Sequence, residues 1–184
     1  EVTRKSTSAM ARIIADGIVN GEARRETSAR LQSDLEARLN GARFVKAGRS
    51  SFTPEYYAEL VTRTRTREAV TQGAISRTLE HGVTLAQISF HSSACDVCKR
   101  YEGKVFSLVK DDGSGFPFLD RRPPFHPNCR HVLVGYVLIP GREDEVRALK
   151  LLSNSKSPIQ EQDRTYEEAL AAAKRLGVHR LKVA

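Results

Sequence analysis

Three cysteines and two of the five histidines gather in two short motifs near the middle of the chain. Cys95 and Cys98 are two residues apart, and after 27 further residues His126 and Cys129 have the same separation. Two thiols at this spacing can bind one tetrahedral ion from a tight turn, and a second turn can complete the ligand set. Thiolates combined with imidazole suit zinc, and four protein ligands make a closed site of the structural kind. The sequence therefore predicts one structural zinc ion bound by Cys95, Cys98, His126 and Cys129.

The choice of histidine ligand stays open at this point. His126 has the better spacing, because it pairs with Cys129 as Cys95 pairs with Cys98. His131 lies two residues beyond Cys129, so it can replace His126 or lie outside the site. His91 can also reach the ion, or contact its ligands from outside the coordination sphere.

The cysteines have three alternative roles besides metal binding. An odd number of cysteines in one window argues against a disulfide framework. A redox dithiol normally opens a helix after a strand in a parallel α/β pattern, and the sequence has no such pattern. Buried, unreactive cysteines are the third alternative. Metal binding is favoured because the three cysteines and two histidines come from only two motifs.

The elements before these motifs are helical. Apolar residues between Met10 and Leu39 recur every three or four residues, which predicts one broken helix or two. Residues 41–51 have no apolar period and are interpreted as a linker. Thr53-Pro54 then begins a long helix that ends at His81-Gly82. The alternation of Thr and Arg over 62–67 would also fit a strand, but the flanking helical period continues through it.

The elements around and after the motifs are shorter. Three β-favouring runs, at 83–90, 105–109 and 132–139, predict a small sheet, and the proline-rich segment 116–127 is expected to be an irregular loop. A short helix is expected at 143–152, and a capping box at Thr165–Glu168 opens another that closes near Gly177. The predicted fold class is α+β, predominantly α: long N-terminal helices, a small zinc-stapled β module and a short helical tail. The corresponding segments are 1–50, 51–140 and 141–184.

Composition limits the classes of function. The chain has 184 residues, 40% apolar and 28% charged, which is too apolar for a disordered polyelectrolyte. No run approaches the roughly 18 apolar residues of a membrane span, so no membrane partner is expected. The net charge of +8 favours anionic partners, yet it is spread along the chain, so non-specific contact with DNA competes with an ordinary soluble surface. The sequence has no nucleophile with a placed base and no dinucleotide-binding motif. We therefore expect no enzyme activity and no small-molecule substrate.

Several motifs together resemble a known family. They are Tyr56–Ala69, His91, Cys95-Asp-Val-Cys98, Glu102–Ser107 and Pro124–His131. This set resembles tailed-phage minor capsid proteins of the head-morphogenesis group, related to phage Mu F-like proteins and phage minor capsid protein 2. The resemblance covers about residues 51–140. The zinc prediction rests on this chain's own ligands, because some relatives lack one or both cysteines of the first pair.

The resemblance implies a structural protein present in small copy number inside the phage head. It implies association with the portal and other capsid proteins, and a need for the protein in head assembly or DNA delivery. The expected location is the virion interior near the portal, and the host cytoplasm during assembly. No catalytic residue is implied.

Two rivals come from other classes of protein. A zinc-containing His-Asn-His nuclease is suggested by Asp120, His126, Asn128 and His131. Its metal ligands would have to be spread over a following loop and helix, whereas here both histidines lie within six residues and precede the strand-like run 132–139. A DNA-binding zinc module would need a basic recognition helix after the last ligand, and the sequence has none there.

Overall fold

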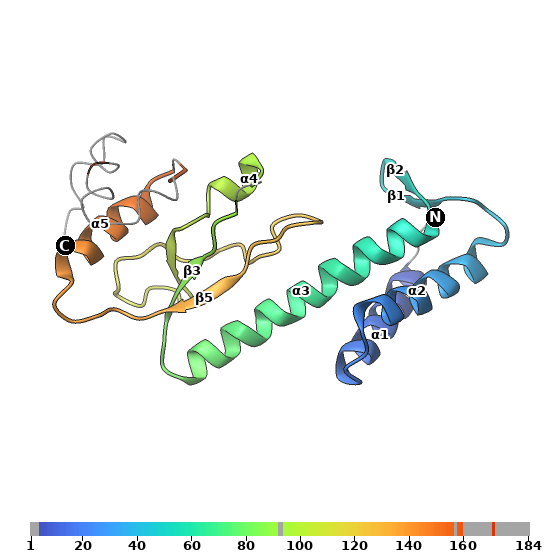
Figure 1. Ribbon diagram of the computed structural model, residues 1–184, viewed down its shortest axis with the longest axis horizontal. Helices are drawn as coiled ribbons and strands as arrows, with labels where there is room; N and C mark the ends of the chain where they lie inside the picture. Colours follow the sequence, from blue (N-terminus) through green and yellow to red (C-terminus); the bar gives the residue numbers. More distant parts are fainter. Residues whose placement is uncertain (1–3, 92–93, 157, 160–170, 172–184) are drawn as a thin grey trace. The chain divides into compact units, whose positions relative to one another are not determined.

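The computed structural model describes residues 4–91, 94–156, 158–159 and 171 (Figure 1). The chain divides into two compact units, residues 1–69 and residues 70–184. The boundary between them lies within one long helix. The tail helix expected to open at Thr165 lies outside the described residues.

The first unit begins with two helices, α1 (Arg4–Val19) and α2 (Arg24–Leu39). The apolar period of this region is therefore broken into two helices, and the break contains Gly21 in the left-handed conformation at φ 66°. The Glu26 carboxylate accepts a hydrogen bond from the backbone N–H of Ala23 at 3.0 Å, which satisfies a donor at the start of α2. The buried core of this unit consists of Met10, Ile14, Leu31, Leu35 and Ala58.

The segment interpreted as a linker contains a small β-hairpin. Strand β1 (Val45–Ala47) pairs antiparallel with β2 (Ser50–Phe52), and Val45 lies opposite Phe52. Gly48, between the strands, has a positive φ of 61°. Each strand is only three residues long, and Val45 is the one buried residue of the two strands together. The sequence therefore carries almost no alternating pattern of apolar and polar residues here.

The long helix is confirmed as α3 (Pro54–Glu80), 27 residues in length. The hydroxyl of Thr53 accepts a hydrogen bond from the backbone N–H of Tyr56 at 3.3 Å, as expected of a capping residue. The helix ends before Gly82, whose φ is 72°. Within the Thr and Arg alternation, the Thr64 hydroxyl donates to the Leu60 carbonyl at 2.8 Å, an interaction available only in a helix.

The second unit contains the predicted small sheet. Strands β3 (Leu85–Ile88), β4 (Val105–Ser107) and β5 (Leu133–Tyr136) form an antiparallel sheet in the order β4-β3-β5. Ala86 in the central strand lies opposite Phe106 on one side and Gly135 on the other. All three strands were expected from their β-favouring runs, and β5 lies at an edge of the sheet.

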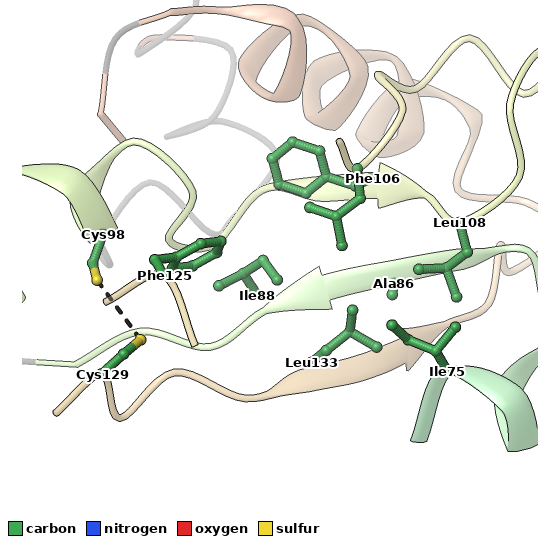
Figure 2. Packing of buried hydrophobic residues seen from close by; sticks show 10 residues of the cluster. Ile75, Ala86, Ile88, Cys98, Phe106, Leu108, Phe125, Cys129 and Leu133 are labelled. Atoms are coloured by element: carbon green, nitrogen blue, oxygen red, sulfur yellow. Dashed lines mark hydrogen bonds between the residues drawn. The ribbon is translucent and has the colours of Figure 1, made fainter. Parts of the chain in front are cut away.

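A buried apolar cluster covers this sheet, as Figure 2 shows. Ile88, Phe106 and Leu133 come from the three strands, and Ile75 comes from the last turns of α3. Phe125, from the loop before β5, is fully buried, and its ring stacks on Tyr101 with a centroid distance of 4.2 Å. The loop is therefore anchored to the sheet by an aromatic side chain.

A second apolar cluster joins the predicted short helix to β4. This helix is α5 (Glu143–Asn154), and its Leu149 packs with Val105 and Phe116. The Ser153 hydroxyl accepts a hydrogen bond from the backbone N–H of Val105 at 3.0 Å. The fold is α+β and mainly helical, as predicted. No helix in the described part of the chain is both long enough and apolar enough to cross a lipid bilayer.

Candidate metal centre

The first pair of cysteines lies on a single turn of helix, α4 (Asp96–Lys99). Cys95 is the residue immediately before the helix, and its carbonyl accepts a hydrogen bond from the Lys99 N–H at 2.9 Å. Cys98 faces inward and is buried, whereas Cys95 is exposed. One tight turn therefore presents two thiols, one at the surface and one at the end of the core.

The second pair lies on the turn that follows Phe125. The Cys129 N–H donates to the His126 carbonyl at 3.0 Å, and Asn128 has a positive φ of 69°. His126 Nδ1 lies 2.6 Å from the Pro127 carbonyl oxygen. A carbonyl can only accept, so Nδ1 carries the proton and Nε2 keeps its lone pair. The tautomer of His126 is thus the one that can bind a metal through Nε2.

The two turns converge on Cys98. His126 Nε2 lies 3.3 Å from the Cys95 sulfur and 3.1 Å from the Cys98 sulfur. The Cys98 and Cys129 sulfurs lie 3.9 Å apart at one end of the apolar cluster, where Figure 2 shows them facing each other. Ligand atoms that share one tetrahedral zinc ion are separated by about 3.5 to 3.8 Å. The observed separations are close to that range.

His131 forms a second group of ligand atoms with Cys98 and Cys129. Its Nδ1 lies 3.5 Å from the Cys129 sulfur, and its Nε2 lies 2.7 Å from the Glu102 carboxylate. Two overlapping groups result, Cys95–Cys98–His126 and Cys98–Cys129–His131, and within each the ligand atoms lie within 4.8 Å of one another. Cys98 belongs to both groups. The five donors therefore lie in two groups of three that share Cys98, and Cys129 belongs to the group of His131 rather than to that of Cys95 and His126.

His91 lies beside this cluster rather than in either group. Its Nε2 lies 3.3 Å from the Ser89 hydroxyl, and its ring meets that of His131 edge-on at a centroid distance of 4.8 Å. Its backbone N–H donates to Glu102 at 2.7 Å. His91 thus contacts the partner of His131 and not the thiols.

The family model of phage minor capsid protein 2 matches residues 6–183, which is nearly the whole chain. The chain belongs to this family. Neither the curated proteins nor the solved structures include a significant match to it. Membership gives the minor capsid protein a structural role in a phage virion, where it contacts other virion proteins.

The donors of the minor capsid protein fit a zinc ion by their chemistry. Three free thiols and an imidazole nitrogen are soft or borderline ligands, the type that selects zinc over magnesium or calcium. Each group supplies three protein donors, so a tetrahedral zinc ion in one group would need a fourth ligand from the other group or from solvent. The chemistry that such an ion supplies is cross-linking of the two turns.

The two thiols on α4 differ in acidity. Backbone N–H groups, chiefly that of Cys98, point at the Cys95 sulfur and lower the pKa of that thiol. Burial, reinforced by the neighbouring Cys95 and Cys129, strongly raises the pKa of Cys98. Cys95 is therefore the more readily ionised thiol, and Cys98 would ionise only when a cation binds beside it.

Glu102 had no role in the sequence interpretation. It lies 29 residues before its partner His131, so no local spacing connects them. The available signal was a carboxylate in Tyr-Glu-Gly-Lys, directly before the fully buried strand β4. A carboxylate at the edge of a buried strand needs a hydrogen-bond partner, and in this protein the partner is the buried His131.

Proposed function

We propose that this protein is a portal-associated component of head morphogenesis whose sheet module is stapled by one structural zinc ion. The observation that carries the proposal is the convergence of Cys95, Cys98, His126 and Cys129 from two turns in a member of a minor capsid family. Family membership supplies the virion role. The convergence supplies the reason why the module holds together.

The zinc ion is assigned a structural role because of what surrounds it. The strands of the sheet are three or four residues long, so the sheet has little hydrogen bonding of its own. The segment from Phe116 to His131 between β4 and β5 forms no helix and no strand of its own beyond one isolated bridge. Binding free energy from a metal at the base of this segment becomes folding free energy of the module.

The surface proposed to face the portal is the edge of the sheet at residues 132–139. Its exposed aliphatic side chains are Val132, Val134, Val137, Leu138 and Ile139. Val134 is 57% exposed and Val137 is 64% exposed, although both lie in or next to an edge strand. Exposed apolar edge strands pair readily with other chains, so this one is expected to be covered in the virion.

Contact with packaged DNA is proposed as non-specific. The support is the net charge of +8, which favours phosphates in a salt-dependent way. The nuclease alternative receives no support from the region after the second histidine. There the described chain continues as strand β5, whereas a His-Asn-His site needs a helix at that place. We infer a non-catalytic role.

Metal analysis tests the staple. Purified protein should contain one zinc per chain by elemental mass spectrometry, and Cys98→Ser should lose the zinc and unfold at a lower temperature. Leu133→Ala is the matched control, because it removes a buried side chain of the same cluster without touching a thiol. It should lower stability and keep the zinc. Full zinc loss in both variants would show that metal content only follows folding, and would contradict the staple.

Incorporation into heads tests the docking surface. Val134→Lys should reduce co-purification with the portal from infected cells, while Val70→Lys, at a valine on α3 that is at least as exposed, should not. Equal incorporation of both variants would remove residues 132–139 from the interface. Plasmid cleavage with added magnesium or manganese, abolished by His126→Ala in a folded protein, would overturn the non-catalytic role.

A further inference from the structure

A pocket of about 720 Å³ opens beside α4, between this turn, the start of β4 and the end of α5. Four of its lining side chains are cationic: Lys99, Arg100, Lys104 and Lys156. Among the lining residues that the structure describes, Asp96 is the single carboxylate, and it pairs with Lys99 at 3.5 Å. The pocket therefore carries an excess of positive charge.

Lys104 is the unusual member of this lining. Its side chain is only 2% exposed, and its ammonium group donates a hydrogen bond to the Ser155 carbonyl at 2.5 Å. In the described part of the chain, no carboxylate lies within 4.0 Å of this ammonium group. Burial accordingly lowers the pKa of Lys104 to about 8. A buried cation whose acceptor in the described part of the chain is a neutral carbonyl is costly, and an anion bound beside it would offset that cost.

The walls of the pocket favour a compact anion. Tyr101 and Phe106 form part of the lining and lower the local polarity, which strengthens the attraction between opposite charges. The hydroxyls of Ser153 and Ser155 add short polar groups next to Lys104. The charged rim at Lys99, Arg100 and Lys156 is exposed, so these side chains can close on a ligand from solution.

We propose that this pocket binds a phosphate group, with Lys104 in its interior and Lys99, Arg100 and Lys156 at its rim. A phosphate offers several acceptor oxygens and at least one negative charge, which matches several converging N–H donors. The guanidinium of Arg100 can engage two phosphate oxygens at once, and the lysines act as point charges. The phosphate can belong to a nucleic-acid backbone or to a free or terminal phosphate, and the experiment separates these sources.

The test uses the zinc-loaded full chain and isothermal titration at constant ionic strength. The three probes are inorganic phosphate, a 5′-phosphorylated oligothymidine and the same oligothymidine without the 5′-phosphate. For each probe that binds the wild-type protein, Lys104→Met should lower the affinity at least tenfold. Lys110→Met, at an exposed lysine outside the pocket, makes the same change in net charge and should alter affinity by less than twofold.

The probes identify the source of the phosphate. Lys104-dependent binding of both oligonucleotides assigns the pocket to the phosphodiester backbone. Binding of only inorganic phosphate and the 5′-phosphorylated strand assigns it to a free or terminal phosphate. Equal weakening by Lys104→Met and Lys110→Met, or no binding of any probe, overturns the proposal.

Two controls keep the result interpretable. Lys156→Gln changes an exposed rim residue, so it should fold normally and weaken binding several-fold even if Lys104→Met folds poorly. Zinc content is measured in every variant, and none of the substituted residues is a proposed ligand. A protein that retains zinc but binds no phosphate would reject the pocket and leave the proposed staple intact.

Discussion

The Glu102 carboxylate accepts a hydrogen bond from Nε2 of His131 at 2.7 Å, and both side chains are almost fully buried. This acceptor fixes the proton on Nε2 of His131, so Nδ1 is directed at Cys129. The same carboxylate accepts the backbone N–H of His91. Glu102 therefore joins the segment after β3 to the turn that carries Cys129, whether or not His131 itself binds a metal.

Replacing Glu102 by Ala should destabilise the protein by about 2 to 4 kcal/mol, because it leaves the buried ring N–H of His131 and the partly buried backbone N–H of His91 without their acceptor. Urea unfolding at neutral pH measures this loss. Asp144→Ala removes the carboxylate of an exposed pair with Arg147 and should change stability by less than about 0.5 kcal/mol. Similar losses in the two variants would mean that the buried pair contributes no more than an exposed one.

The histidine that binds the metal can be identified by cobalt substitution. His126 Nε2 lies 3.3 and 3.1 Å from two thiols, closer than the 3.5 Å from His131 Nδ1 to Cys129, so we expect His126→Gln to weaken metal binding at least tenfold. We expect His131→Gln to keep the tetrahedral cobalt spectrum and to lower only stability. The reverse pattern would assign the ion to Cys98, Cys129 and His131 and would exclude His126 from the ligand set.

The stability of the protein should depend on pH through Lys104. Its pKa is about 8 in the folded protein and 10.5 ordinarily, so between these values the unfolded chain binds more protons than the folded one. Stability attributable to Lys104 therefore rises with pH across this interval, by at most about 3 kcal/mol. Lys104→Met should lose this rise. The measurement is the unfolding free energy of wild type and variant at pH 7 and at pH 10. The unfolding free energy of wild type minus that of the variant should be larger at pH 10 than at pH 7. A difference that is the same at both pH values would contradict this role of Lys104.

Gly103 should not tolerate a side chain. It has a φ of 69°, and a Cβ there would overlap the ring of Phe90. Gly113 has a similar φ of 71° and no atom near the position of an added Cβ. An alanine at this position therefore measures the cost of the positive φ alone. We expect Gly113→Ala to cost about 1 kcal/mol and Gly103→Ala to cost about 1 to 3 kcal/mol more. Thermal unfolding of the two variants compares these costs, and equal costs would argue against tight packing at Phe90.

The sequence predicted those parts of the fold that have a strong local signal. The capping pair Thr53-Pro54 and the stop at Gly82 locate α3 closely, and the runs that became β3, β4 and β5 are bounded by turn residues. The hairpin at residues 45–52 was interpreted as a linker instead. Two three-residue strands with one buried side chain do not produce a readable period.

The two candidate pairs of metal ligands can be recognised in the sequence because each pair has a local spacing. The interactions that position them depend on long-range packing and were not predictable. Tyr101 stacks on Phe125, 24 residues later, and Glu102 meets His131, 29 residues later. Lys104 would be expected at the surface from its type alone, since lysine is rarely buried without a partner. The packing of the end of α5 against β4 places the Ser155 carbonyl at its ammonium group.

Helix α4 contributes Cys98 to the sulfur cluster and Lys99 to the rim of the cationic pocket, although it is only four residues long. If the proposed metal and the proposed phosphate are coupled through this one turn, that coupling is reciprocal. Whatever factor the metal adds to the affinity for phosphate, phosphate must add to the affinity for the metal. Occupancy of one proposed site would therefore change the affinity of the other.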